Sequence, residues 1–191
     1  MQQSPFRIAV FASGAGTTLQ TLIDSQKSHD FKVSLVVSNR QCTALDRAEA
    51  NDIPTLLTKD WQEIDKVLNN KEIQLVVLAG FLAIIPRWVC ANWDCKIINI
   101  HPSLLPKHGG KGMYGIHVQE SVLVSKDSVA GCTVHYVSAE IDGGKIIAQA
   151  TVEVLTDDTA ESLAARVQEQ EKQLLPRVIS EIATTYRTSL N

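Results

Sequence analysis

Residues 7–38, RIAVFASGAGTTLQTLIDSQKSHDFKVSLVVS, contain the pattern that decides the expected fold. Two mostly apolar runs, Arg7–Ala12 and Lys32–Ser38, flank a segment, Thr17–Ser25, whose apolar residues recur at helical spacing. Apolar runs of this length are typical of strands that are buried in a sheet. The stretch therefore predicts a strand, a helix and a second strand parallel to the first.

The same alternation continues along the chain to residue 100. Helical spacing recurs in two further segments, and short apolar runs recur in three. The expected helices are Thr43–Asn51 and Trp61–Asn69, and the expected strands are Pro54–Leu57, Leu75–Ala79 and Ile97–Ile100. Because apolar strands separated by helices are typical of parallel sheets, the pattern predicts an α/β fold with helices on both faces of a mostly parallel sheet.

The pattern changes after residue 100. His101–Gly115 contains two prolines and four glycines, which predicts a long loop, and a helix is expected at His117–Ser125. Two β-rich runs follow, Ala130–Val137 and Lys145–Val154, joined by a segment that ends in Asp-Gly-Gly at 142–144. That turn chemistry favours a tight turn and an antiparallel strand pair near the C-terminus.

The last expected element is a long helix. Thr-Asp-Asp-Thr at 156–159 is a helix start signal, and helical spacing continues from Ala160. Pro176 is expected to kink or break this helix. Because the chain shows neither internal repeats nor a composition change, we expect one domain over residues 1–191.

The composition is that of an ordinary globular protein and argues against several classes of function. The 191 residues carry a net charge of −3, without the basic stripe of a nucleic-acid binder. No apolar run approaches the roughly 20 residues of a membrane span, and the N-terminal one is too short for a secretory signal. The four cysteines form no Cys-x-x-Cys pair, as expected of reduced thiols. We therefore expect a cytoplasmic monomer or homodimer that binds small molecules.

The first candidate site is the loop Ser-Gly-Ala-Gly-Thr-Thr at 13–18, between the first expected strand and helix. Free N–H groups at a helix N-terminus bind phosphate well, although a glycine turn that only packs strand on helix explains the pattern equally well. The loop lacks the Gly-Lys-Ser/Thr of a Walker loop and the third glycine of a dinucleotide loop. Arg40, after the second strand, can hold a 2′-phosphate, so an NADP enzyme stays open as an alternative.

The second candidate site is Asn-Ile-His-Pro-Ser-Leu-Leu-Pro at 99–106, at the end of an apolar strand. Residues two apart on a strand point to the same side, so Asn99 and His101 are expected to face one cleft. An amide donor beside an imidazole suits a developing oxyanion. The alternative is a histidine bonded to backbone, with the asparagine making a turn.

Three further acidic or amide side chains are candidates. Asp142 lies in the expected turn, where such residues usually bond their own backbone. Gln168 and Glu171 are three apart on the last helix, so they share a face that binds hydroxyls or is simply solvated. A zinc site is not expected, because the four histidines between residues 101 and 135 show no His-x-x-x-His spacing.

Together, four motifs resemble the phosphoribosylglycinamide formyltransferases, a folate-dependent family of purine biosynthesis. They are Ser-Gly-Ala-Gly at 13–16, Asn-Ile-His-Pro-Ser-Leu-Leu-Pro at 99–106, Asp-Gly-Gly at 142–144 and Arg-Val-Gln-Glu-Gln-Glu at 166–171. The resemblance covers nearly the whole chain. It implies a Rossmann-like formyltransferase fold and transfer of the formyl group of 10-formyltetrahydrofolate to the amine of glycinamide ribonucleotide, without a metal.

The resemblance also implies roles for particular residues. Catalytic roles are implied for Asn99, His101 and Asp142. Contacts with the phosphate and ribose of the acceptor are implied for Gly16, Thr17, Thr18, Gln168 and Glu171. Contacts with the folate are implied for Lys59, Leu82, Ala83, Ile84, Ile85, Asn99, Ser138, Ala139, Glu140, Ile141 and Asp142. His135 matches a family histidine near the cleft.

The chain departs from the family pattern at a few positions. The family usually has Ser-Asn where this chain has Thr17 and Thr18, so the amide donor is missing. It often has arginine at the position of Ala83, and a family arginine becomes Lys59. The loop Lys107–Gly115 is longer than in some relatives.

The implied reaction is attack of a primary amine on a formyl carbon. Asn99 and protonated His101 would stabilise the oxyanion, and Asp142 would favour the charged imidazole and help to move the amine proton. Two sister reactions use a similar site: hydrolysis of formyl-folate, in enzymes with an added N-terminal domain, and formylation of methionyl-tRNA, in enzymes with an added C-terminal module. A binding module without catalysis is a third alternative, which explains the glycine loop but not the polar trio of Asn99, His101 and Asp142.

Overall fold

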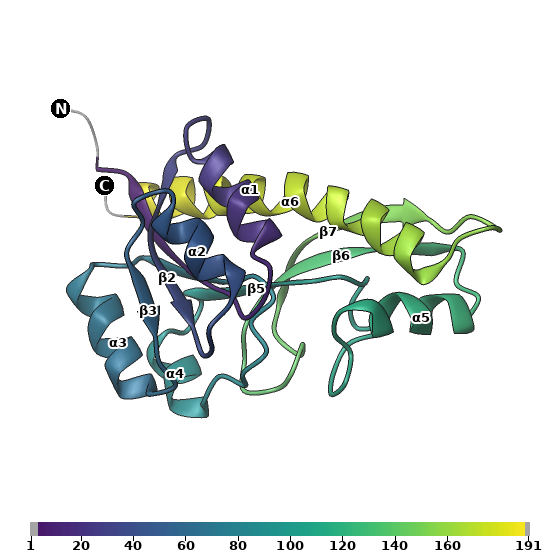
Figure 1. The fold of residues 1–191 in the computed structure, drawn as a ribbon, viewed down its shortest axis with the longest axis horizontal. Helices are drawn as coiled ribbons and strands as arrows, with labels where there is room; N and C mark the ends of the chain where they lie inside the picture. The colour runs from purple at the N-terminus through teal and green to yellow at the C-terminus, as the bar shows by residue number, and fades with distance from the viewer. Residues whose placement is uncertain (1–3, 190–191) are drawn as a thin grey trace.

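Seven strands form one sheet in the computed structural model, which describes residues 4–189 (Figure 1). The strands are β1 (Phe6–Phe11), β2 (Phe31–Ser38), β3 (Thr55–Leu57), β4 (Leu75–Leu78), β5 (Ile97–His101), β6 (Val129–Tyr136) and β7 (Ile146–Glu153). The helices are α1 (Thr17–Ser25), α2 (Thr43–Glu49), α3 (Trp61–Asn70), α4 (Arg87–Asn92), α5 (Ile116–Val124) and α6 (Ala160–Thr188).

The strand order is β3-β2-β1-β4-β5-β6-β7. Neighbours are parallel from β3 to β5 and antiparallel from β5 to β7. The predicted α/β fold, with a mostly parallel sheet and an antiparallel C-terminal pair, is confirmed. The predicted elements match the observed ones to within two residues at each end, but α4 was not predicted. This six-residue helix, which begins after Pro86, is too short to show a helical period.

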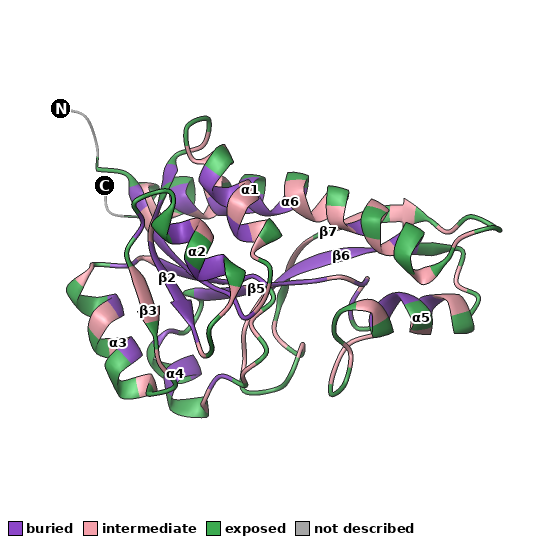
Figure 2. Ribbon diagram, viewed as in Figure 1, coloured by how far each residue is buried: buried purple, intermediate pink, exposed green. Residues whose placement is uncertain are grey.

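Alternate residues of the central strands pack against different helices, which makes two cores. Ile8 and Val10 of β1 belong to the core that α1, α2 and α6 cover. Ala9 and Phe11 belong to the core that α3 and α4 cover. Figure 2 shows the buried residues concentrated on the central strands and on the inner side of α6. This period of two explains why the strands are apolar throughout: both of their faces exclude water.

The helix α6 runs along one face of the sheet (Figure 1) and is continuous through Pro176. Of the predicted kink or break at Pro176, the break is therefore wrong. Pro176 is buried between Leu175 and Val178, so packing of the helix on the sheet compensates for the backbone hydrogen bond that proline cannot donate.

The segment that follows β5 is held in place by one buried hydroxyl. Thr133 of β6 donates from Oγ1 to the carbonyl of Ser103, at 2.6 Å, and accepts from the backbone N–H of Leu105, at 3.0 Å. The same oxygen accepts from Nε2 of Gln149 on β7, at 2.9 Å. Residues 103–105 are thereby tied to both antiparallel strands.

Replacing Thr133 with valine tests this tie. Valine keeps the volume and the strand preference but leaves a buried N–H and a buried carbonyl without their partner, so we expect a loss of about 2–4 kcal/mol in the free energy of unfolding. Urea denaturation measures this loss. Thr151→Val, at an exposed position of β7, is the matched control and should change stability by less than about 0.5 kcal/mol. Equal, small effects of both changes would contradict the proposed tie.

Candidate active site

A cleft of about 600 Å³ lies at the carboxyl ends of β1, β4 and β5. Ligands bind at this edge in open α/β sheets. Its walls are the glycine loop before α1, the segment after β4, the loop before α5, the loop between β6 and β7, and one face of α6. The predicted site residues that line it are Gly16, Thr17, Thr18, Leu82, Ala83, Ile84, Ile85, Asn99, His101, Ser138, Ala139, Glu140, Ile141, Asp142, Gln168 and Glu171.

Lys59 is the one predicted site residue that does not line the cleft. It is exposed in the turn between β3 and α3, at the outer edge of the sheet. The structure therefore brings together the predicted acceptor, folate and catalytic residues but leaves Lys59 apart from them.

The glycine loop combines both of the interpretations that the sequence left open. Gly16 caps α1 with a left-handed φ of 71°, and a Cβ there would lie 2.8 Å from the Cα of Ala44, so glycine is needed for packing against α2. The loop also lines the cleft, next to the free N–H groups of the first turn of α1. Arg40 does not line the cleft, and its Nε donates to the carbonyl of Ser13, at 2.6 Å. The NADP alternative depended on Arg40 as the residue that holds a 2′-phosphate, and this position does not support it.

Ser13 links the glycine loop to the opposite wall of the cleft. Its hydroxyl accepts from the backbone N–H of Leu82, at 3.2 Å, and donates to Oδ1 of Asn39, at 2.9 Å. Its backbone N–H donates to the carbonyl of Gly80, at 3.1 Å. The side chain is 1% exposed, so this contact fixes the glycine loop against the apolar segment after β4. The sequence placed Ser13 in the candidate loop but did not predict this linking contact.

The face of α6 that lines the cleft carries both predicted residues. Nε2 of Gln168 donates to Oγ1 of Thr17, at 3.2 Å, and so joins α6 to the first turn of α1. Burial raises the pKa of the Glu171 carboxyl to about 7. Cys132 lies nearby, and burial together with the charge of Glu171 raises its pKa to about 12. The predicted shared face of Gln168 and Glu171 is therefore part of the cleft.

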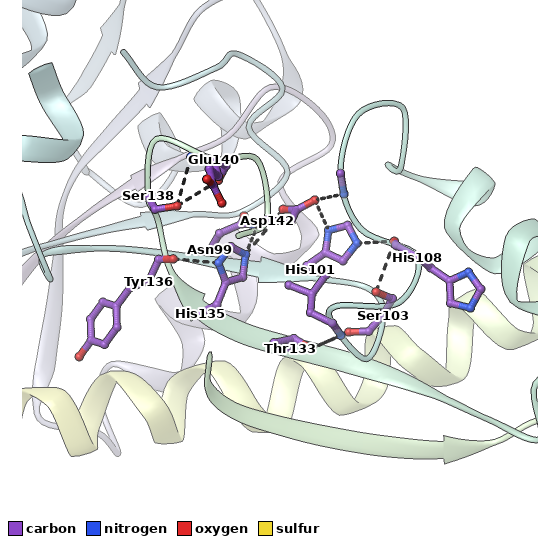
Figure 3. A network of polar contacts seen from close by, with 12 residues as sticks. Asn99, His101, Ser103, His108, Thr133, His135, Tyr136, Ser138, Glu140 and Asp142 are labelled. Atoms are coloured by element: carbon purple, nitrogen blue, oxygen red, sulfur yellow. Dashed lines mark hydrogen bonds and ion pairs between the residues drawn. The ribbon is translucent and has the colours of Figure 1, made fainter. Parts of the chain in front are cut away.

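Asn99 and His135 are cross-strand neighbours on β5 and β6 and are hydrogen bonded through their side chains (Figure 3). His135 places Nδ1 2.9 Å from the carbonyl of Tyr136, which accepts only, so Nδ1 carries a hydrogen. Burial lowers the pKa of His135 and keeps the ring neutral. Its Nε2 is therefore an acceptor for Nδ2 of Asn99, at 3.1 Å, and this contact fixes which end of the amide presents N–H groups.

His101 uses its two ring nitrogens differently (Figure 3). Nε2 donates to the carbonyl of His108, at 2.9 Å, and Nδ1 lies 3.6 Å from Oδ2 of Asp142. The ring is 4% exposed. The alternative of a histidine bonded to backbone thus holds for one edge of the ring, while the other edge faces the acid that the resemblance paired with it.

Asp142 bonds outside its own turn, so the alternative of a turn aspartate that only bonds its own backbone does not hold. Its Oδ2 accepts from the N–H of Gly110, at 2.9 Å, and its Oδ1 lies 3.7 Å from Nε2 of His135. The residue has a left-handed φ of 54°, a conformation that aspartate and asparagine tolerate better than most residues. The predicted tight turn is present at 140–143, closed by Gly143 N–H to Glu140 C=O at 3.2 Å, inside a longer connection.

The far wall of the cleft is apolar and open. The side chains of Leu82, Ile84 and Ile141 are 53%, 72% and 48% exposed, although large apolar residues usually avoid water. Ser138 bonds within its own loop, to the backbone of Glu140. This wall therefore offers apolar side chains and loop backbone groups, a surface that suits a flat, partly polar ring system.

The loop before α5 also supplies cleft residues that the sequence did not single out. Lys111, Met113 and Tyr114 line the cleft, and so does Gln119 of α5, whose Nε2 donates to the carbonyl of Pro102 at 2.7 Å. The only sequence signal was the length of the loop. Within residues 4–189, no cluster of three or more histidine, cysteine or acidic residues is arranged to hold a metal, and no helix is long and apolar enough to cross a membrane.

Comparison with known proteins identifies the class. Residues 6–179 match the family described as formyl transferase, so the chain belongs to that family. It is 38% identical over 185 residues to a phosphoribosylglycinamide formyltransferase of Haemophilus influenzae, a match that covers 91% of this chain and 85% of the relative. The crystal structure of phosphoribosylglycinamide formyltransferase from Anaplasma phagocytophilum superposes with a TM-score of 0.89 at 39% identity, over 95% of this chain and 89% of that one.

A plant relative is longer. The chloroplastic phosphoribosylglycinamide formyltransferase of Vigna unguiculata is 37% identical over 185 residues, which are 91% of this chain. The chain spans 59% of the length of that protein.

The raised pKa of Glu171 predicts a pH-dependent stability. Because the folded state holds this proton more tightly than the unfolded state, stability falls as the pH rises from about 4.5 to about 7. Glu171→Gln removes the titration and should exceed the wild type at pH 8 by roughly 1–3 kcal/mol, with a gain that fades towards pH 4.5. Denaturant unfolding at several pH values measures the gain. Glu169→Gln, on the exposed side of the same helix, should show no such trend, and an equal trend in both variants would refute the assignment.

Proposed function

We propose that this chain transfers the formyl group of 10-formyltetrahydrofolate to the amine of glycinamide ribonucleotide. The products are formylglycinamide ribonucleotide and tetrahydrofolate. The observation that carries the proposal is the continuity of the cleft: a helix N-terminus suited to phosphate and an open apolar wall meet at Asn99, His101 and Asp142. The names of the relatives favour this acceptor over other amines.

The two substrates enter from opposite ends of the cleft. The phosphate of the acceptor binds at Gly16, Thr17 and Thr18, where the N–H groups and the positive end of the α1 dipole favour an anion. The ribose hydroxyls bind Gln168 and Glu171, one turn along α6. Phosphate and ribose thus direct the acceptor amine towards Asp142.

The folate binds the apolar wall on the other side. Its ring system lies against Leu82–Ile85, and its polar edge bonds the backbone of Ser138–Asp142. Ala83 provides no polar side chain, so contacts at that position involve backbone only. The exposed apolar area of Leu82 and Ile84, which is unfavourable in the free protein, is buried by this ligand.

The chemistry follows from the positions of the three polar side chains. The acceptor amine attacks the formyl carbon, a C–N bond forms, and the carbonyl electrons move to oxygen. Asn99, whose amide is oriented by His135, donates an N–H to that oxyanion, and the positive charge of protonated His101 stabilises it.

Asp142 accepts the proton that leaves the attacking amine. This proton then passes to the folate nitrogen as the oxyanion collapses and the old C–N bond breaks. Because the amine is itself a competent nucleophile, the site needs no nucleophilic side chain. The location in the cytoplasm and the monomer or homodimer state remain sequence predictions.

Hydrolysis of the formyl-folate is the rival reaction at such a site. Incubation with 10-formyltetrahydrofolate, with and without glycinamide ribonucleotide, separates the two, because tetrahydrofolate should form only when the acceptor is present. Turnover that is independent of the acceptor would establish the hydrolase, and the absence of turnover in both would leave a binding module.

Substitutions in the polar trio should lower the rate of formyl transfer more than they weaken substrate binding. Asn99→Ala and His101→Ala each remove a group that acts on the oxyanion, so kcat should fall about 10²–10³-fold with little change in KM. Asp142→Asn keeps the left-handed backbone but removes the charge, so it should lower kcat and act non-additively with His101→Ala. Asn70→Ala, exposed at the end of α3, is the control. A folded His101→Ala protein with near-normal kcat would exclude His101 from the mechanism.

A further inference from the structure

A second polar cluster lies outside the cleft, on the far side of the loop that covers His101. The ring of His108 bonds at both nitrogens: Nδ1 lies 2.8 Å from Oγ of Ser121 on α5, and Nε2 lies 2.9 Å from Oδ2 of Asp127, after α5. Lys107 also bonds Asp127, with Nζ 3.0 Å from Oδ1. The hydrogen bonds of His108 and Lys107 lower the pKa of Asp127, so this acid stays charged.

The cluster superficially resembles a hydrolytic serine, histidine and aspartate triad. Ser121, however, does not line the small cavity of about 240 Å³ next to His108 and Asp127, so its hydroxyl does not meet a substrate there. The pairing of Ser121, His108 and Asp127 instead joins a loop to a helix.

The backbone of residues 108–110 contacts two members of the proposed catalytic trio. The carbonyl of His108 accepts from Nε2 of His101, at 2.9 Å, and the N–H of Gly110 donates to Oδ2 of Asp142, at 2.9 Å (Figure 3). One short segment thus keeps a hydrogen on Nε2 of His101 and holds Asp142 opposite its Nδ1. A shift of this segment changes both groups at once.

The start of the segment is held by Ser103, whose Oγ donates to the carbonyls of Lys107 and His108, at 2.7 and 3.4 Å. His108 has a left-handed φ of 53°, which is uncommon for a residue with a Cβ, and Gly109, Gly110 and Gly112 follow it. Glycines add conformational freedom, so the loop needs a fixed point. Ser103 holds only the preceding side of the segment, and the two ring contacts of His108 provide a fixed point on the other side, because they join it to residues 13 and 19 positions further along the chain.

We propose that His108 is a positioning residue for formyl transfer. Its side chain, held by Ser121 and Asp127, fixes the backbone that orients His101 and Asp142. The proposal rests on the proposed function, because it assigns His108 a role in that reaction. It differs from a purely structural role in that loss of the ring should affect catalysis more than substrate binding or global stability.

Two variants separate the ring from the backbone. His108→Phe keeps a planar ring but loses both hydrogen bonds, and His108→Gly relieves the left-handed backbone while it also loses the ring. Because small errors in placement cost large factors in rate, we expect kcat to fall about 10- to 100-fold in both, with KM for each substrate within about twofold of the wild type. Asp127→Asn, which retains an acceptor oxygen, should keep more of kcat than Asp127→Ala. His117→Phe, an exposed histidine at the start of α5, is the matched control.

A second readout does not depend on turnover. In the wild type, the Nε2 proton of His101 should be protected from exchange and visible in proton NMR, and it should be lost in His108→Phe and retained in His117→Phe. If the wild type does not transfer formyl groups, the proposed function fails, and this signal still decides whether His108 holds His101. The proposal is overturned if His108→Phe retains kcat in an active enzyme, or if the Nε2 proton of His101 persists in that variant.

Discussion

The antiparallel pairing of β5 with β6 is the interaction on which the site depends. Every earlier strand pair is parallel, and on that side the cross-strand neighbour of Asn99 is the apolar Leu78 of β4. Because β6 returns along β5, Asn99 lies opposite His135 and His101 lies opposite Thr133. The reversal of strand direction therefore supplies the histidine that orients Asn99 and the hydroxyl that holds residues 103–105, which follow His101.

Around the β5–β6 pair, the two histidines are oriented by backbone carbonyls, which can only accept hydrogen bonds. The carbonyl of Tyr136 fixes the tautomer of His135, and His135 then fixes the amide of Asn99. The carbonyl of His108 keeps a hydrogen on Nε2 of His101 and so fixes the orientation of that ring. Such buried networks are stable only when all members are satisfied, so they hold one arrangement and resist others. Asp142 lies between the two histidines, where a charge is useful for proton transfer.

The fold was largely predictable from the sequence because its central parallel strands are mostly apolar and its longer helices have a regular period. The exceptions have local causes. The helix α4 is shorter than two turns, and burial of Pro176 on the sheet outweighs the tendency of proline to break a helix.

The site was predictable where residues share one strand or one helix, as Asn99 and His101 do, or where the family resemblance placed them, as with Asp142. It was not predictable where contacts join distant loops. The bonds of His108 to Ser121 and Asp127 leave no periodic signal. Burial likewise decides the unusual pKa of Glu171, and burial depends on the packing of the whole cleft.

The central claim is that neutral His135, protonated on Nδ1, orients the amide of Asn99. Correlation of ring nitrogens with carbon-bound ring protons by NMR, with His135→Gln used to assign the signals, tests it directly. Because burial lowers the pKa of His135 below its ordinary value of 6.5, we expect a neutral ring at pH 6.5, with hydrogen on Nδ1 and none on Nε2. A ring that is protonated on Nε2, or charged at that pH, would contradict the account.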